Sequence, residues 1–422
     1  MPENKIVAAL IAPFRVLRNG VFAKLYFAQT VSLLGDAFTW IGLALVSYQF
    51  GAERSAVILA TALTLRVLAF IVFSPFAGVL ADRIDRKKIL YVTHFIRMVI
   101  VVGMAFISAE WQIYGLVFLL NVFNAFFTPT YKSIIPHVVP KADYRQAIGL
   151  STATFQLLGV LGPGLAGIMA VWFGFRTIFL IDAASFVLAG LLILTLPGEL
   201  IGTSERRNPA PALPSTWGSI AQSTRLLFSN PLIRFALVIE FISAMAGAQI
   251  LVNTIGHVKE GLSLTDRDYG WVMAAFGIGA SVAAFFSGSL DSSKSRRVSL
   301  IVGGGLLGLA IVTANFVGFA ALTGLWVVAG LGQSLAEIPS ETLIGENIDE
   351  AMQGKVYGAH FAFSHLWWAI AYPVAGFWGS RFPDRDFLYG GLLTLGLLAA
   401  ALIFFRPGRS ESPKTISSPT FP

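Results

Sequence analysis

The sequence contains no cysteine and few charged side chains. Without cysteine the chain can form neither a disulfide, nor a thiolate metal site, nor a cysteine nucleophile. Charged residues make up 13% of the 422 residues, whereas soluble proteins have about 25%. Also missing are the zinc-protease motif H-E-x-x-H, the phosphate-binding loop G-x-x-x-x-G-K-[ST] and the hydrolase elbow G-x-S-x-G. We therefore expect no enzyme, no ATP-driven pump and no cofactor.

Long apolar runs take the place of charged surface. The composition is 55% hydrophobic with a mean hydropathy of +0.72, and 41 glycines are spread through the apolar runs. A helix that spans a bilayer needs about 20 mostly apolar residues, and glycine lets such helices pack closely. The sequence predicts an all-α membrane protein with twelve transmembrane helices. They are expected at 21–50, 55–81, 89–108, 111–131, 145–170, 174–196, 232–256, 266–290, 298–317, 319–340, 353–380 and 386–406.

The net charge of +7 follows the predicted topology. If the N-terminus is cytoplasmic, 22 of the 30 lysines and arginines fall in cytoplasmic segments. Six fall outside, and Arg66 and Arg97 lie within spans. This bias predicts that both termini are cytoplasmic. The basic charge then reflects topology and contact with anionic membrane lipids, and we expect no nucleic acid partner.

The chain divides at a polar segment near its middle. Residues 197–231 contain GTSERRNPAPALPSTWGS, and we expect them to form a cytoplasmic linker with a surface helix at 215–228. The linker would separate two pseudo-symmetric six-helix bundles, 21–196 and 232–406. Residues 1–20 are predicted to form an interfacial amphipathic segment rather than a signal peptide, and 407–422 a cytoplasmic tail.

A charged hairpin is repeated in the two predicted bundles. The segment GVLADRIDRKKIL begins at Gly78, and GSLDSSKSRRVSL begins 288 − 78 = 210 residues later, at Gly288. The same offset relates Pro129 to Pro339, Pro163 to Pro373 and Lys24 to Arg234. Such an internal repeat in a very apolar chain predicts two related bundles that move against each other, with a substrate path between them.

These features resemble the major facilitator superfamily. Its loop signature, G-x-x-x-D-[RK]-x-G-[RK]-[RK], is similar to the first hairpin, although Asp85 stands in place of a glycine. The resemblance implies a conformational motif in which Asp82 stabilises one transport state by facing a helix N-terminus. The residues assigned to this motif are Gly78, Asp82, Arg83, Arg86, Lys87, Gly288, Arg296 and Arg297.

Other segments resemble exporters within that superfamily. Span five contains GVLGPGLAG, which is similar to an exporter helix motif and assigns a role in bending or sealing to Gly159, Gly162, Pro163 and Gly167. Ordinary glycine-mediated packing is the alternative for this segment. LLGDAF, NAFFTPTYKSIIP and IDAASF resemble siderophore and macrolide exporters. THFIRM and the segment WQIYGLVFLLNVFNAFFTPTYK resemble bacterial nickel-resistance exporters, although this chain has no histidine in its tail.

Ionisable residues within spans are the strongest functional candidates. A charge in lipid costs at least about 2.5–3.5 kcal/mol unless it is paired or hydrated. The candidates for proton coupling or substrate binding are Asp36, Arg66, Arg97, Glu240 and Glu337. Asp36 and Arg66 lie at similar depth on consecutive spans and could form an ion pair, while Asp182 is interpreted as a structural partner. A structural ion pair remains the alternative for each carboxylate.

Three histidines are candidates for a metal site. His94 lies three residues before Arg97, so the two share a helix face. His360 and His365 are about 140° apart on one helix, so both would need ligands from other helices. Imidazole and carboxylate suit nickel or cobalt, whereas isolated membrane histidines are commonly structural.

We therefore expect a proton-coupled exporter (an antiporter for efflux) that moves a small toxic solute outward. A transition metal such as nickel or cobalt is the first substrate hypothesis, and a siderophore, macrolide or other drug is the alternative. A lipid flippase and a non-transporting scaffold are lesser alternatives. The architecture needs no partner protein, so a monomer is expected.

Overall fold

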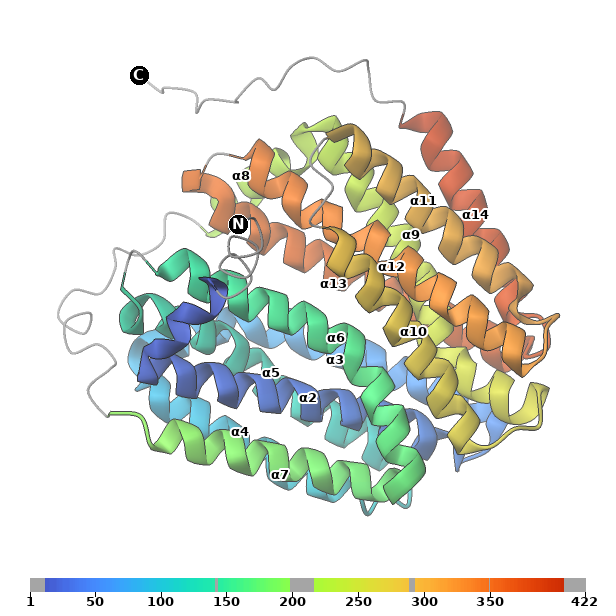
Figure 1. Cartoon of the computed structure of the whole chain (residues 1–422), viewed down its shortest axis with the longest axis horizontal. Helices are drawn as coiled ribbons and strands as arrows, with labels where there is room; N and C mark the ends of the chain where they lie inside the picture. Colours follow the sequence, from blue (N-terminus) through green and yellow to red (C-terminus); the bar gives the residue numbers. More distant parts are fainter. Residues whose placement is uncertain (1–11, 141–142, 198–215, 288–292, 349, 406–422) are drawn as a thin grey trace, which may run out of the picture. The chain divides into compact units, whose positions relative to one another are not determined.

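The structure is a computed structural model that describes residues 12–140, 143–197, 216–287, 293–348 and 350–405. These residues form helices and no strand. Twelve long helices coincide with the predicted spans (Figure 1). They are α2 (Gly20–Tyr48), α3 (Ala52–Arg83), α4 (Arg86–Met104), α5 (Glu110–Val138), α6 (Tyr144–Phe173), α7 (Phe175–Leu194), α9 (Pro231–Gly256), α10 (Asp266–Ser287), α11 (Ser293–Ala314), α12 (Phe319–Asn347), α13 (Glu350–Arg381) and α14 (Asp386–Phe404).

Two shorter elements flank the long helices. A 3-10 helix (Ala12–Arg18) precedes α2, and the predicted surface helix is α8 (Thr216–Ser229). Among the described residues, 8 helices are long and apolar enough to cross a membrane. They are α2, α5, α7, α9, α11, α12, α14 and the Glu53–Ser74 part of α3.

The chain forms two compact units. The first comprises Met1–Val46 and Leu68–Pro211, and the second comprises Ser47–Val67 and Ala212–Pro422. The end of α2 and the beginning of α3 therefore belong to the second unit. Contacts and sites are described below within each unit.

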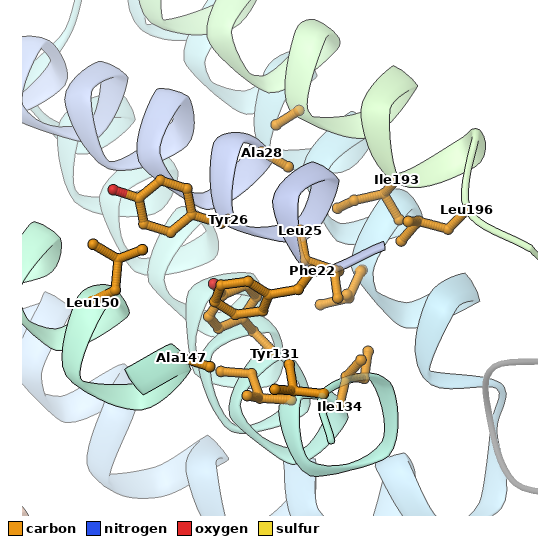
Figure 2. Packing of buried hydrophobic residues seen from close by; sticks show 14 of the residues in the cluster. Phe22, Leu25, Tyr26, Ala28, Tyr131, Ile134, Ala147, Leu150, Ile193 and Leu196 are labelled. Atoms are coloured by element: carbon orange, nitrogen blue, oxygen red, sulfur yellow. The ribbon is translucent and has the colours of Figure 1, made fainter. Parts of the chain in front are cut away.

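The core of the first unit is built around the beginning of α2. Figure 2 shows Phe22 and Leu25 of α2 among side chains of the neighbouring helices, including Tyr131 of α5 and Ile193 of α7. Both α2 residues are completely buried. The cluster joins α2 to α4, α5, α6 and α7, so one apolar core fixes the position of all five helices in this unit.

Helix α9 is the central element of the second unit. Its residues are buried on every side, and it contacts α11, α12, α13 and α14. A helix that is apolar all round and buried is expected at the centre of a membrane bundle. The buried polar residues of α9 find partners within α9, as in the Asn253–Gln249 hydrogen bond, and on neighbouring helices, as in the bond from Asn253 to Ala375 O of α13.

Glycines bring three helices of the second unit into backbone contact. A Cβ on Gly330 of α12 would overlap the carbonyl oxygen of Phe276 on α10, and one on Gly279 of α10 would overlap that of Val327. On the other side of α12, a Cβ on Gly303 of α11 would lie 2.7 Å from the oxygen of Gly332. Because no side chain fits at these points, the glycines determine how closely the helices pack.

The internal repeat is visible in the helix ends. The side chain of Asn19 accepts hydrogen bonds from Val21 N and Phe22 N at the start of α2, and its amide donates to Val138 O at the end of α5. Asn230 accepts from Leu232 N and Ile233 N at the start of α9, and its amide donates to Asn347 at the end of α12. The two asparagines are 230 − 19 = 211 residues apart, one residue from the register of the sequence repeat.

Alanine at Gly330 should destabilise the protein because its methyl group would overlap the backbone of α10. We expect Gly330→Ala to cost about 1–3 kcal/mol of unfolding free energy. The control is Gly324→Ala on the same helix, where a Cβ would meet no atom within 4 Å. Thermal unfolding in detergent should show a lower midpoint for Gly330→Ala alone, and equal midpoints would contradict the close contact.

Candidate functional site

A buried ion pair lies inside the first unit. Arg97 of α4 is 1% exposed, and its Nη2 donates to both carboxylate oxygens of Asp36 on α2, at 2.8 and 2.9 Å. The side chain of Asp36 is 20% exposed. The guanidinium is ionised in proteins at any ordinary pH, so this pair fixes a permanent positive charge within the span. Sequence analysis selected both residues as candidates.

A second carboxylate completes what we call the Asp–Arg–Asp cluster (Asp36, Arg97, Asp182 and the hydroxyls of Thr39 and Ser185). Asp182 of α7 is completely buried. It accepts a short hydrogen bond from Thr39 Oγ1 of α2 and another, of 3.0 Å, from Ser185 Oγ. Sequence analysis interpreted Asp182 as a structural partner. In the structure it lies close enough to Asp36 and Arg97 to interact electrostatically with both.

Aromatic rings surround the cation of this cluster. The guanidinium carbon of Arg97 lies 4.1 Å from the ring centroid of Phe186 and 5.6 Å from that of Phe127. His94 is also completely buried and contacts the same two rings. Neither ring nitrogen of His94 has a hydrogen-bond partner in the structure. The contact with Phe186 supplies cation–π stabilisation to a buried guanidinium.

The second unit contains its own polar cluster within the spans. His360 Nε2 of α13 lies 2.8 Å from one carboxylate oxygen of Glu240 on α9 and 3.0 Å from the other. Both residues are buried. Glu337 of α12 accepts hydrogen bonds from Ser243 Oγ of α9, at 3.2 Å, and from Gln333 Nε2. The structure thus places both predicted carboxylates of this unit beside polar partners.

Arg66 belongs to the second unit and lies near aromatic residues of α13. It is close enough to His365 and Tyr372 to act on both electrostatically. His365 is hydrogen-bonded to the carbonyl of Phe361 one turn earlier, at 2.8 Å, and its ring contacts the Phe361 ring. The predicted Asp36–Arg66 pair would join the two units and stays a prediction, while Arg97 is the partner that the structure gives to Asp36.

The candidate metal ligands are distributed over both units. His94 lies in the first unit, and His360 and His365 lie in the second. Within the described part of the chain, no group of three histidine, aspartate or glutamate side chains could hold a metal ion. His360 instead has Glu240 as its partner, and His365 uses Nδ1 for a backbone contact. The described geometry therefore gives the metal hypothesis no support.

The charged hairpin stabilises helix ends in the first unit. Asp85, which differs from the family pattern, accepts a hydrogen bond from Lys87 N and so forms the N-cap of α4. Lys87 Nζ donates to Leu196 O at 2.5 Å, and Lys24 Nζ donates to Thr195 O at 3.2 Å. Both lysines thereby place positive charge at the negative C-terminal end of α7. The backbones of Gly78, Asp82 and Arg83 are helical, but their side chains are not among those described.

Each of the two hairpins contains a buried arginine that contacts a residue near the end of another helix. Arg86 is buried and lies 3.4 Å from both ring nitrogens of His137 near the end of α5. Arg296, at the repeat offset of 210, is buried to the same degree and pairs with Glu346 near the end of α12. Arg297 lies over the ring of Phe235, 5.7 Å from its centroid. Gly288 falls outside the described residues.

The proposed exporter motif lies within α6, which is helical without interruption from Tyr144 to Phe173. Gly162 is buried where a Cβ would overlap that of Ala37 on α2. Ala37 is the neighbour of Asp36, so this glycine brings α6 close to the Asp–Arg–Asp cluster. Gly167 is also buried, whereas the surroundings of Gly159 and Pro163 are not described.

Comparison with known proteins identifies the family. The family model described as Major Facilitator Superfamily matches residues 25–253 and 237–421. The chain belongs to the Major Facilitator Superfamily. It is therefore a multi-pass membrane transporter, as the resemblance of its motifs implied, and the related proteins include efflux pumps.

Several relatives in this superfamily are bacterial. An uncharacterized MFS-type transporter of Bacillus subtilis, YfiS, is 26% identical over 79% of this chain and 80% of its own length. Macrolide efflux protein A of Streptococcus pyogenes is 27% identical over 41% of this chain and 43% of its own. A homolog of the multi-drug resistance efflux pump PmrA, from Lactococcus lactis, is 27% identical over 57% of this chain and 58% of its own.

Solved structures share the fold. The nucleoside transporter NupG superimposes with a TM-score of 0.69 at 14% identity, covering 92% of this chain and 99% of that one. A bacterial homolog of the human lysosomal transporter Spinster, in an inward-facing and unoccupied conformation, gives the same TM-score and identity over 92% and 96%. At these identities the likeness establishes the architecture alone.

Removing the cation of the first unit should strongly destabilise the protein. Arg97→Gln leaves the carboxylate of Asp36 without its counter-charge inside the bundle, and we expect a loss of about 3–5 kcal/mol. The double variant Asp36→Asn/Arg97→Gln removes this negative charge and should recover part of the loss. Chemical unfolding in detergent checks both, with Arg176→Gln, an exposed arginine, as the control. A double variant that is less stable than Arg97→Gln would contradict the pairing.

Proposed function

We propose that the protein is a proton-coupled exporter in a bacterial inner membrane, with both termini in the cytoplasm. The observation that carries this proposal is the Asp36–Arg97 pair, which lies within a span and not at a helix end. Burying it costs free energy that an apolar pair of residues would not. A carboxylate that can exchange its guanidinium partner for a proton provides a reason to keep such a pair, because the negative charge of the carboxylate is compensated in both states.

The substrate that we favour is a macrolide or another hydrophobic drug. The support is the printed function of two relatives, a macrolide efflux protein and a multidrug efflux pump. The second unit adds aromatic surface beside its polar cluster, because Phe241 contacts Trp367 and Trp368 contacts Tyr372. Aromatic rings beside a few polar groups are typical of sites that bind drug-sized ligands.

Two other substrates remain hypotheses. The siderophore hypothesis has the same aromatic and polar surface in its favour and rests on the resemblance of sequence segments. The nickel or cobalt hypothesis rests on a similar resemblance and on the three candidate histidines. It would need a ligand set that assembles in another conformation, because the described residues form no such group.

Asp36→Asn should abolish transport that is driven by a pH gradient. Asparagine cannot bind and release a proton, so the coupling step is lost while the size of the side chain is kept. In proteoliposomes loaded with a radiolabelled macrolide, we expect at least a tenfold loss of gradient-driven flux. The control is Glu53→Gln, an exposed carboxylate at the start of α3, which should retain wild-type flux. Full activity in Asp36→Asn would refute the assigned role.

A resistance panel should identify the substrate class. A sensitive bacterial strain that expresses the wild-type protein is compared with one that expresses Asp36→Asn, on macrolides, nickel, cobalt and an iron-limited medium. We expect macrolide resistance to rise severalfold with the wild-type protein alone. Resistance to nickel or cobalt without macrolide resistance would replace the drug hypothesis with the metal hypothesis, and changed siderophore secretion would favour the third.

A further inference from the structure

We infer that Asp182 stores the coupling proton, and that Arg97 moves from Asp36 to Asp182 when that proton leaves. The inference rests on the proposed proton-coupled function and adds a second residue to it. It concerns a carboxylate that sequence analysis interpreted as structural. Its basis is the arrangement of three ionisable groups on α2, α4 and α7.

The first argument is the position of Asp182 against α2. A Cβ on Gly35 would overlap both Asp182 Oδ1 and Ser185 Oγ, so the absent side chain of Gly35 makes room for this carboxyl group. Thr39, one turn later on the same helix face, reaches the other oxygen, Oδ2. Asp36 lies between these two residues in sequence. The segment 35–39 of α2 therefore carries the Asp36 carboxyl group and also contacts the Asp182 carboxyl group of α7.

The second argument is the position of Arg97. Its Nη2 contacts Asp36, while its Nε is buried and has no hydrogen-bond partner. Its guanidinium lies over the ring of Phe186, which is four residues and so about one turn after Asp182 on α7. The cation thus contacts the helix that carries Asp182, and it retains an unused donor. The redirected pairing would therefore be made toward a helix that the guanidinium already contacts.

The third argument is the charge of the cluster. With both carboxyl groups ionised, a single guanidinium would leave one uncompensated negative charge among apolar helices. Residues 111–131 of α5 and 146–173 of α6 contain no charged residue or histidine. His94 of α4 is a further titratable group nearby, and its ring packs against those of Phe127 and Phe186. A bound proton restores neutrality, and an isolated buried charge is too costly to persist.

The proton belongs on Asp182 in this structure. Asp36 has the guanidinium and is partly exposed, whereas Asp182 has only hydroxyl partners and is completely buried. Hydroxyl groups suit both forms of a carboxyl group, since each can donate to a carboxylate or accept from a carboxylic acid. Thr39 and Ser185 can therefore serve Asp182 before and after it loses the proton.

The exchange keeps the charge constant. The O–H bond of the Asp182 carboxyl group breaks, and the proton is transferred to a carboxylate oxygen of Asp36. Arg97 moves in the opposite direction, from Asp36 to the new carboxylate of Asp182. Asp36, with a side chain that is 20% exposed, then exchanges the proton with water. The internal transfer leaves no ion without its counter-ion, and after release the uncompensated carboxylate is that of Asp36, at the partly exposed position where water can solvate it.

The test is infrared spectroscopy of the purified full-length protein in lipid nanodiscs at neutral pH, without a substrate. A protonated carboxyl group absorbs at a higher C=O frequency than a carboxylate, and ¹³C labelling of aspartate separates aspartate from glutamate. We expect an aspartic acid band in the wild-type protein that is lost in Asp182→Asn. An unchanged band in Asp182→Asn would overturn the inference.

A second pair of variants leaves Asp182 in place and tests the movement of Arg97. Asp36→Asn frees the guanidinium, which should pair with Asp182 and remove the band. Asp36→Asn/Arg97→Gln removes the cation as well and should restore it. A purely structural Asp182 would show the same band in both variants, which would overturn the inference even if Asp182→Asn fails to fold. Failure of the proposed function is a separate outcome, namely wild-type flux in Asp36→Asn.

Discussion

A positive charge that cannot be titrated, buried within an apolar bundle, constrains the interior of the first unit. Arg97 is 1% exposed and carries its charge at every physiological pH. Each neighbour is of a kind that such a charge requires: a carboxylate on α2, a second carboxyl group on α7 and the face of an aromatic ring. The glycine at position 35 then follows, since a larger residue would displace the second carboxyl group.

The second unit has the same architecture and a different interior chemistry. Its Glu240–His360 contact joins two groups that can both titrate, and Glu337 has hydroxyl and amide partners. These groups can adjust their charge to their surroundings, which a guanidinium cannot do. The repeated helices and helix ends therefore carry two different polar clusters. One contains a fixed cation between two carboxyl groups, and the other contains several hydrogen-bonding side chains beside aromatic rings.

The helices could be predicted from the sequence because their length is set by the thickness of the bilayer. Each predicted span overlaps a helix of the structure, and α9 differs from its prediction by one residue at its start. The functional candidates Asp36 and Arg97 could also be found, because charges within apolar runs are rare. The pairing of Asp36 with Arg97 could not be predicted from the sequence. Consecutive spans suggested Arg66 as the partner of Asp36, and only the packing of α2 against α4 and α7 brings Arg97 to it.

Local departures from a pattern could also not be interpreted by sequence alone. Asp85 occupies a glycine position of the family signature, and the sequence did not reveal that its side chain forms the N-cap of α4. The role of Gly35 had no signal at all, because glycine is frequent throughout the chain. Its importance depends on a carboxyl group 147 residues away in sequence (182 − 35), and this kind of contact follows from tertiary packing alone.

The asparagines at positions 19 and 230 bear on how a duplicated chain can diverge. Each begins the first long helix of its repeat and also holds the far end of another helix in the same unit. A residue that caps one helix and binds the end of another fixes how the ends of the two helices align. With the helix ends aligned in this way, mutation could change the middle of each copy while its helices keep their alignment. Ancestral sequences of this lineage should accordingly agree at their helix boundaries long after their interiors have become unrecognisable.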